Sequence, residues 1–173
     1  MISDAGLIVA AAGSSRRFGA GGNKLLFNLN GCPVLCHMLK TLVPLFAEDA
    51  VCVMVPAGQE SDFSALFGDF PALTQVRVLA GGATRQASVV KGLSALPEHV
   101  DVAVIQDGAR PFTTAELIQA CVASAREHGS GIAARRVTDT IKVATDEGDV
   151  LSTPDRRSLW AVETPQVFQR SVV

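Results

Sequence analysis

Short apolar runs alternate with helical patterns along most of the chain. Continuous apolar runs at residues 7–12 and 50–55, and the largely apolar segment 100–105, indicate strands that are buried on both faces. Two further strands are expected at residues 76–78 and 131–137. Between the strands, apolar positions spaced by three or four residues predict helices at 34–42, 61–67, 89–96 and 117–125. This alternation predicts an α/β fold, with a mostly parallel sheet and helices on both faces.

Local signals mark where some of these elements begin and end. Pro33 can open the first helix, and Thr113 with Glu116 forms a T-x-x-E capping box before the last one. Gly129 ends that helix. Val167 and Phe168 begin a further element that looks unfinished where the chain stops.

The pattern changes after Val137. Residues 141–145 and 150–153 flank the sequence Asp-Glu-Gly-Asp at 146–149, which is typical of a turn. We therefore expect a hairpin that leaves the main sheet. The chain as a whole is predicted to form one domain, residues 1–173, with an arm at about residues 138–156.

Composition narrows the class of protein. The 173 residues are 48% hydrophobic and 18% charged, which excludes a disordered chain. The net charge of −2 argues against a general nucleic-acid binder. There is no apolar run of about 20 residues and no basic segment before the first apolar run, so we expect neither a membrane span nor a secretory signal. A cytoplasmic protein with no nucleic-acid or membrane partner is the expectation.

The sequence gives little support for a metal site or for catalysis by histidine. The cysteines at 32, 36, 52 and 121 form no C-x-x-C pair, and the three histidines are scattered. A zinc site is therefore not expected. Cys52 and Cys121 lie in apolar stretches and are interpreted as small core residues.

Small and charged residues follow the first predicted strand. Ala11-Ala12-Gly13 is followed by a Gly-rich stretch that contains Arg17 and ends at Lys24. Small residues allow the backbone to approach a ligand closely, and successive N–H groups can cradle phosphate. The segment matches neither the Walker pattern nor the dinucleotide fingerprint G-x-G-x-x-G.

Three more clusters follow later predicted strands. They are Gly81-Gly82-Ala83-Thr84-Arg85, Asp107-Gly108-Ala109-Arg110-Pro111 and Thr138-Asp139-Thr140. Ligands of open α/β sheets bind beyond the carboxyl ends of the strands. The four clusters therefore predict an anion-binding site at this edge, where Asp107 suits a hydroxyl group or a metal ion.

These motifs resemble the 2-C-methyl-D-erythritol 4-phosphate cytidylyltransferase family over essentially the whole chain. The residues that carry the resemblance are Ala11-Ala12-Gly13, Arg17, Lys24, Gly81-Gly82, Arg85, Ser88-Val89, Asp107, Ala109-Arg110-Pro111, Asp139-Thr140-Ile141-Lys142, Arg156, Leu159-Trp160 and Thr164-Pro165-Gln166-Val167-Phe168. The resemblance implies a Rossmann-like fold of the nucleotide-diphospho-sugar transferase type.

The resemblance also implies roles for individual residues. The residues expected to hold the cytidine nucleotide are Ala11, Ala12, Gly13, Gly82, Ser88 and Asp107. Arg17 and Lys24 would grip the triphosphate and act in catalysis. The residues expected on the side of the second substrate are Asp107, Arg110, Thr140 and Arg156.

The implied reaction is transfer of CMP from CTP to a polyol phosphate, with release of pyrophosphate. The attacking phosphate is already an anion, so no strong general base is needed. Mg²⁺ is the expected cofactor, held mainly by phosphate oxygens rather than by a certain set of protein ligands. The resemblance further implies a homodimer in which the arm reaches the site of the partner.

The end of the chain differs from the family pattern. Members usually continue for several dozen residues, with a late strand that carries a catalytic lysine in an Asn-x-Lys-x-Thr setting. Because the sequence stops at Val173, we expect the chain as given to be weakly active or inactive, although still able to bind CTP.

Three alternatives remain at this point. A ribitol-5-phosphate cytidylyltransferase would use the same nucleotide loops, although the hairpin and the Arg156 region favour methylerythritol phosphate. A catalytically lapsed nucleotide-binding module is the second alternative, and turnover with CTP would exclude it. A Rossmann-type oxidoreductase is weaker, because the glycine fingerprint is absent.

Overall fold

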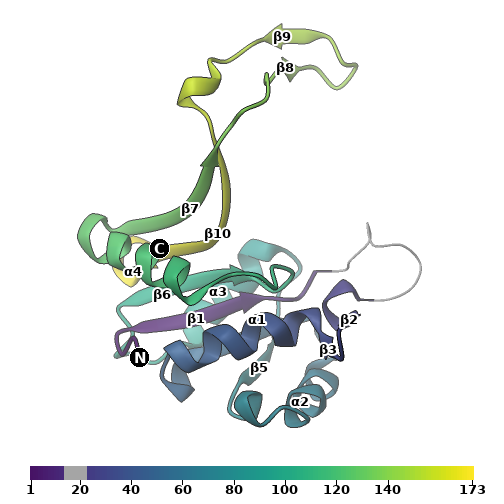
Figure 1. Ribbon diagram of the computed structural model, residues 1–173, viewed down its shortest axis with the longest axis vertical. Helices are drawn as coiled ribbons and strands as arrows, with labels where there is room; N and C mark the ends of the chain where they lie inside the picture. The colour runs from purple at the N-terminus through teal and green to yellow at the C-terminus, as the bar shows by residue number, and fades with distance from the viewer. Residues whose placement is uncertain (14–22) are drawn as a thin grey trace.

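The computed structural model describes residues 1–13 and 23–173, and a six-stranded sheet forms its centre (Figure 1). The strand order is β5-β4-β1-β6-β10-β7. The strands are β1 (Ala5–Ala10), β4 (Val51–Val55), β5 (Arg77–Ala80), β6 (Val102–Asp107), β7 (Ser130–Arg136) and β10 (Trp160–Gln169). The first four of these strands run parallel, and β10 pairs antiparallel with both β6 and β7. The mostly parallel α/β sheet is therefore confirmed.

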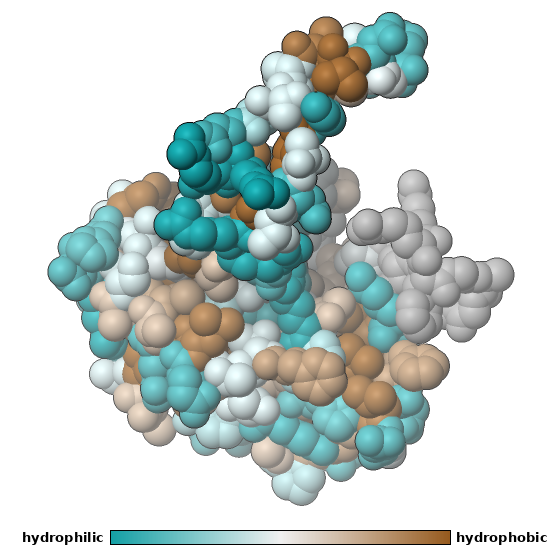
Figure 2. Space-filling view, turned by 45° about the horizontal axis from the view of Figure 1, so that its top comes forward, coloured by the Kyte–Doolittle hydropathy of each residue, from teal (hydrophilic) through white to brown (hydrophobic). Residues whose placement is uncertain are grey.

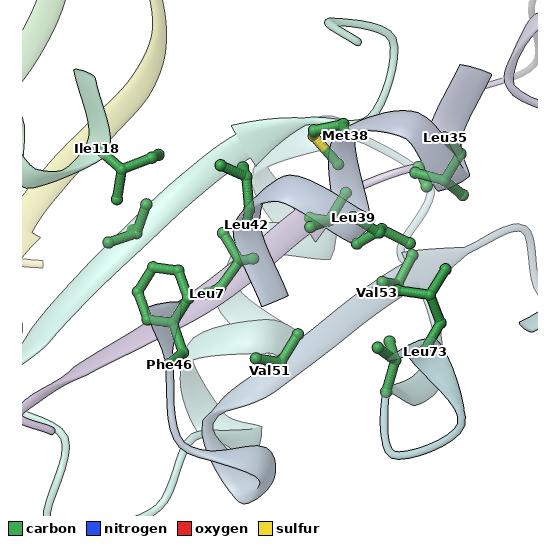
Figure 3. Close-up of a cluster of buried hydrophobic side chains, with 14 of the residues drawn as sticks. Leu7, Leu35, Met38, Leu39, Leu42, Phe46, Val51, Val53, Leu73 and Ile118 are labelled. Carbon is green, nitrogen blue, oxygen red and sulfur yellow. The ribbon is translucent and has the colours of Figure 1, made fainter. Parts of the chain in front are cut away.

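Four α-helices in the described chain cover the two faces of this sheet. They are α1 (Val34–Leu42), α2 (Glu60–Gly68), α3 (Arg85–Ala95) and α4 (Ala115–His128). Leu7 and Val9 of β1 belong to the larger buried cluster, which α1, α2 and α4 complete (Figure 3). Ile8, between them, faces the smaller cluster with Leu93 and Leu96, at the end of α3. Because successive strand residues point to opposite faces, α3 alone covers the second face.

Helix α3 approaches β1 unusually closely. A Cβ atom added at Gly92 would lie 2.4 Å from Cγ2 of Ile8, a side chain that is fully buried. Only a residue without a side chain fits between this helix and the strand. The position of α3, and of the loop that precedes it, is thereby fixed on the sheet.

The structure moves several predicted boundaries. Strand β1 ends at Ala10, so Ala11 and Ala12 lie in the following loop, and Asp107 is the last residue of β6. Helix α3 begins at Arg85, four residues earlier than expected, because Thr84 caps it: Oγ1 accepts a hydrogen bond from Ala87 N at 3.0 Å.

The predicted capping box of α4 is wrong by one position. Thr114 is the N-cap, and its Oγ1 accepts from the backbone N–H of Leu117 at 3.3 Å. Thr113 is instead buried, where its hydroxyl accepts from Nε2 of Gln106 at 3.0 Å. A neighbouring buried amide therefore decides which of two consecutive threonines caps the helix.

Strand β10 was not expected, and the interpretation of Val167 and Phe168 as an unfinished element is wrong. Both residues pair with β6 and β7 in the interior of the sheet. The strand is interrupted by a cis peptide bond at Thr164–Pro165 and by a change of register between Val162 and Gln166. Proline is uncommon inside a central strand, so the sequence pattern pointed away from one.

The predicted hairpin is present and projects from the body of the molecule (Figure 1). It consists of β8 (Val143–Ala144) and β9 (Val150–Ser152), and we call residues 138–156 the arm. A second, unexpected hairpin joins β2 (Asn28–Leu29) to β3 (Cys32–Pro33) through Asn30 and Gly31, which both have positive φ. An Asn-Gly pair is the usual signal for such a turn. None of the described helices is long and apolar enough to cross a membrane.

Candidate active site

A cavity of about 760 Å³ lies at the carboxyl ends of β1 and β6. From β1 the chain continues to β4 and β5 on one side, and then crosses to β6 on the other, so this is the switch point of the sheet. Eight of the residues predicted from the sequence line the cavity: Ala11, Ala12, Gly13, Lys24, Gly82, Ser88, Asp107 and Arg110.

Three predicted residues are not part of this lining. Arg17 lies outside the described residues. Thr140 and Arg156 lie in the arm, where Nη1 of Arg156 donates to the carbonyl oxygen of Thr138 at 2.7 Å. The cavity of a single chain therefore contains the residues predicted to bind the nucleotide, together with Arg110, but neither Thr140 nor Arg156.

The floor of the cavity is made of backbone from adjacent loops. The N–H of Ala11 donates to Met54 O at 2.9 Å, and the N–H of Gly108 donates to Ala10 O at 3.0 Å. These bonds continue the ladders of the sheet past the ends of the strands. The small residues after β1 are thus held in place on the floor of the cavity, where a planar ligand can contact their backbone directly.

The loop after β5 is shaped by hydrogen bonds to α3. Ser88 Oγ accepts from the N–H of Gly82 at 2.9 Å and donates to Thr84 O at 3.0 Å. Nζ of Lys91 donates to Gly81 O at 2.9 Å. A Cβ atom on Gly82 would lie 2.4 Å from that of Ala87, so the close turn requires glycine. Ser88, predicted to hold the nucleotide, holds this turn in the structure.

Opposite charges face each other across the cavity. Nε of Arg85 lies 3.0 Å from Oδ1 of Asp107, and Nε of Arg110 lies 3.9 Å from Oδ2 of the same carboxylate. Lys24 opens a short 3-10 helix, Lys24–Leu26, which Asn23 caps through a 3.1 Å bond from Leu25 N. The cavity therefore carries cations from three separate elements and is suited to a polyanion.

Sequence reasoning did not single out some residues that the structure places in this charge network. Arg85 was quoted as part of a motif but was given no role. Glu163 lies between Arg110, at 2.6 Å, and Arg135, at 3.3 Å. Thr164 Oγ1 accepts from the N–H of Asp107 at 3.2 Å. Glu163 and Thr164 belong to β10, which the sequence pattern did not reveal, whereas Arg85 lies on α3.

Arginines gather where the arm leaves the sheet. Figure 2 shows strongly hydrophilic side chains in this region, with apolar ones towards the tip. The guanidinium of Arg136 lies 4.4 Å from the ring centroid of Trp160, and Arg157 pairs with Asp155 at 2.6 Å. The hydrogen bonds from Arg157 hold the pKa of Asp155 below its usual range. The base of the arm is thus exposed and rich in arginine, and Arg157 is already paired with a carboxylate.

The donor set of the cavity fits a Mg²⁺ ion held chiefly by substrate. Asp107 is the one carboxylate among the described lining residues, and no group of three His, Cys, Asp or Glu side chains in residues 1–13 and 23–173 could hold a metal. Mg²⁺ usually takes one or two carboxylates and completes its shell with phosphate oxygens and water. A dedicated protein cage is therefore not needed here.

The cysteines lie away from this chemistry. All four are free and buried. Burial raises the pKa of Cys36 to about 12 and that of Cys52 to about 11. Thiolates are the reactive form, so these side chains are inert parts of the core. The core role expected for Cys52 and Cys121 is confirmed.

Comparison with known proteins finds one family throughout. The family model described as 2-C-methyl-D-erythritol 4-phosphate cytidylyltransferase matches residues 5–173. A relative of that name from Bacillus velezensis is 39% identical over 168 residues, which is 96% of this chain and 71% of the relative. Another from Thermosynechococcus vestitus is 42% identical over 166 residues, or 94% of this chain and 70% of the relative.

Solved structures agree with this result. The 4-diphosphocytidyl-2C-methyl-D-erythritol synthase of Anaerococcus prevotii superimposes with a TM-score of 0.80 at 26% identity, over 98% of this chain and 73% of that one. The 2-C-methyl-D-erythritol 4-phosphate cytidylyltransferase of Thermus thermophilus gives a TM-score of 0.72 at 28% identity, over 96% and 71%. The chain thus spans a little more than two thirds of each of these proteins.

Proposed function

The chain belongs to the 2-C-methyl-D-erythritol 4-phosphate cytidylyltransferase family, and we propose that its switch-point cavity carries out cytidylyl transfer from CTP to that polyol phosphate. The observation that carries the assignment of the site is the convergence of eight expected residues on one cavity. The ribitol-5-phosphate reaction is not favoured by these relatives. We also propose a cytoplasmic location, which the free, buried cysteines support.

The negative charge of the acceptor phosphate indicates how the reaction proceeds. A phosphate oxygen of the polyol phosphate attacks the α-phosphorus of CTP and forms a new P–O bond. The bond from the α-phosphorus to the bridging oxygen breaks, and its electron pair leaves with pyrophosphate. No histidine lies among the described lining residues, and none is needed, because the attacking oxygen is already anionic.

Catalysis here depends on position and charge. Lys24 contacts the triphosphate, and Arg17, outside the described residues, is proposed for the same task. Fixed cations near the α-phosphorus stabilise the negative charge that builds up in the transition state. Asp107 would be the protein ligand of a Mg²⁺ ion held mainly by phosphate oxygens, and the ion would supply positive charge beside the leaving pyrophosphate.

The nucleotide lies against the backbone loops. Ala11, Ala12, Gly13 and Gly82 offer their peptide groups to the base and ribose, because their small side chains leave the backbone accessible. Asp107 lies at the end of β6, within reach of the ribose and the second substrate. The backbone floor is fixed before the ligand arrives, so binding orders few groups.

The polyol phosphate requires residues from two places. Arg110 comes from the cavity, whereas Thr140 and Arg156 lie in the arm. We propose a homodimer in which each arm completes the site of the partner. Val143, Val150 and Leu151 of the arm are exposed, and a two-stranded ribbon is marginally stable unless it packs on another surface. A second copy of the chain supplies that surface.

The test is a pyrophosphate-release assay on the protein expressed from its complete coding sequence. Four nucleoside triphosphates are each combined with methylerythritol phosphate or ribitol 5-phosphate. Release with CTP and methylerythritol phosphate alone is the expected result. A preference for ribitol 5-phosphate would reassign the acceptor, and CTP binding without release would indicate a lapsed enzyme.

A further inference from the structure

Five side chains of alternating charge lead from the cavity to the base of the arm. Nε of Arg85 lies 3.0 Å from Oδ1 of Asp107, and Nε of Arg110 lies 3.9 Å from Oδ2 of that carboxylate. On its other side, Nη1 of Arg110 lies 2.6 Å from Oε2 of Glu163. Oε1 of Glu163 accepts from Nε of Arg135 at 3.3 Å. Glu163 therefore lies between Arg110 and Arg135 in the part of this charge network that is farther from the cavity.

The irregularity of β10 places Glu163 in this position. Val162 pairs with Ala134 and Gln166 pairs with Ile132, so residues 163–165 of β10 lie opposite a single residue of β7. Extra residues of this kind re-aim side chains next to functional sites. Here the carboxylate of Glu163 contacts the loop after β6 instead of taking a regular place on the sheet.

Two carboxylates compete for the guanidinium of Arg110. Glu163 makes the short contact, whereas Asp107 is 3.9 Å away and is already bound by Arg85. Without the charge of Glu163, Asp107 is the carboxylate left within reach of Arg110. The guanidinium then turns towards Asp107, which removes a donor from the acceptor side and neutralises the acid beside the ribose.

This contact orients Arg110 and adds little to the stability of the fold. The side chains of Arg110 and Glu163 are 39% and 37% exposed, and pairs that are open to solvent contribute little to folding. A guanidinium has five N–H donors in a rigid fork, so one edge can bind Glu163 while another faces a phosphate. The pair can therefore orient Arg110 without using up its donors.

We propose that Glu163 is a positioning residue that holds Arg110 at the rim of the cavity for the phosphate of the acceptor substrate. This inference rests on the proposed function of the site. It assigns Glu163 no contact with substrate, and it predicts that the loss of Glu163 acts through Arg110.

The test uses Glu163→Gln in the protein expressed from its complete coding sequence. We expect KM for methylerythritol phosphate to rise about tenfold or more, the scale of a misplaced binding group, while KM for CTP stays within about twofold. The midpoint of thermal unfolding should not change. Glu163→Asp keeps the charge and should recover part of the lost affinity. Glu127→Gln, an exposed carboxylate on α4, is the matched control and should behave as wild type.

A second pair of variants separates the possible failures. Arg110→Gln should raise the same KM at least as much, and Glu163→Gln added to it should have no further effect. If Arg110→Gln raises KM while Glu163→Gln behaves like the control, or if the two effects add, the positioning role is wrong. If Arg110→Gln leaves KM unchanged, the role proposed for Arg110 fails as well. If wild type does not turn over both substrates, the proposed function itself fails.

Discussion

Arg85 and Asp107, 22 positions apart in the sequence, are joined over the switch point by a 3.0 Å bond between Nε and Oδ1. Arg85 is the first residue of α3, and Asp107 is the last residue of β6. The bond thus ties the nucleotide loop after β5 to the acceptor side of the cavity. In the proposed reaction, this contact lies between the surfaces assigned to the two substrates.

Asp107→Asn should lower kcat/KM by roughly a hundredfold, the scale of losing one preorganised charged group. The amide cannot balance the two guanidinium groups of Arg85 and Arg110, and it is a poor ligand for Mg²⁺. Steady-state pyrophosphate release measures the effect. Asp101→Asn, immediately before the other end of β6, is the control. Equal activities of the two variants would contradict the role of Asp107.

The cavity should select a pyrimidine base. Its described lining contains small residues, charged side chains and Leu25, and no aromatic side chain. We expect the fixed backbones of the loops to hold the smaller pyrimidine base more closely than a purine. Isothermal titration calorimetry should give tighter binding for CTP than for ATP or GTP. Equal or tighter binding of ATP would show that the base is not held in the way we propose.

The shared site can be tested by complementation between subunits. Lys24→Ala and Arg156→Ala should each be nearly inactive alone, because every dimer then carries two damaged sites. After the variants are refolded together in equal amounts, about half the dimers are mixed, and each mixed dimer has one intact site. Activity should return to roughly a quarter of wild type.

The same experiment has a clear contrary outcome. If mixed dimers are demonstrated, for example with a tag on one variant, and the mixture stays inactive, Lys24 and Arg156 act within one chain. The arm would then fold back towards its own cavity.

Gly92→Ala should destabilise the fold. In an exposed helix, alanine would gain up to about 1 kcal/mol over glycine. Here the new methyl group meets Ile8 Cγ2 at 2.4 Å inside the core, and overpacking costs about 1–3 kcal/mol. We expect a net loss of about 1 kcal/mol in urea unfolding. Gly68→Ala at the end of α2, with nothing within 4 Å of the added Cβ, is the control and should be neutral or slightly stabilising.

Asp4 should make a small, pH-dependent contribution to stability. Hydrogen bonds from Arg126, which joins the end of α4 to the start of β1, lower the pKa of Asp4 from its usual 3.8. The stabilisation is complete above 3.8 and is lost as the pH falls through the lowered pKa of the folded state. Because the pair is exposed, we expect Asp4→Asn to cost only about 0.5 kcal/mol at pH 7.

The comparison is made by urea unfolding at pH 7, pH 5 and pH 3. The difference between Asp4→Asn and wild type should shrink at the lowest pH, and added salt should reduce it at pH 7. Glu98→Gln, an exposed carboxylate before β6, is the control. A difference that grows on acidification would contradict this account.

The elements that could be predicted from the sequence are those determined by the pattern of neighbouring residues. Apolar runs such as 50–55 identify buried strands, and residues at the ends of these strands meet because parallel strands share an edge. Glu163 could not be predicted in this way, because its place depends on a register shift between β7 and β10. Pro165 also broke the strand pattern. The pairing of β10 with β6 and β7 outweighs the local preference of proline against a central strand.

The position of β10 between β6 and β7 has a consequence for biosynthesis. Among the strands of the described chain, β7 pairs only with β10, and the arm is synthesised between them. The four parallel strands are complete once β6 has left the ribosome, but the open edge of β6 and the whole of β7 must wait until β10 emerges. Open edges invite pairing with other chains. The nascent protein therefore carries open strand edges, which favour aggregation, from the emergence of β6 until β10 has emerged and paired.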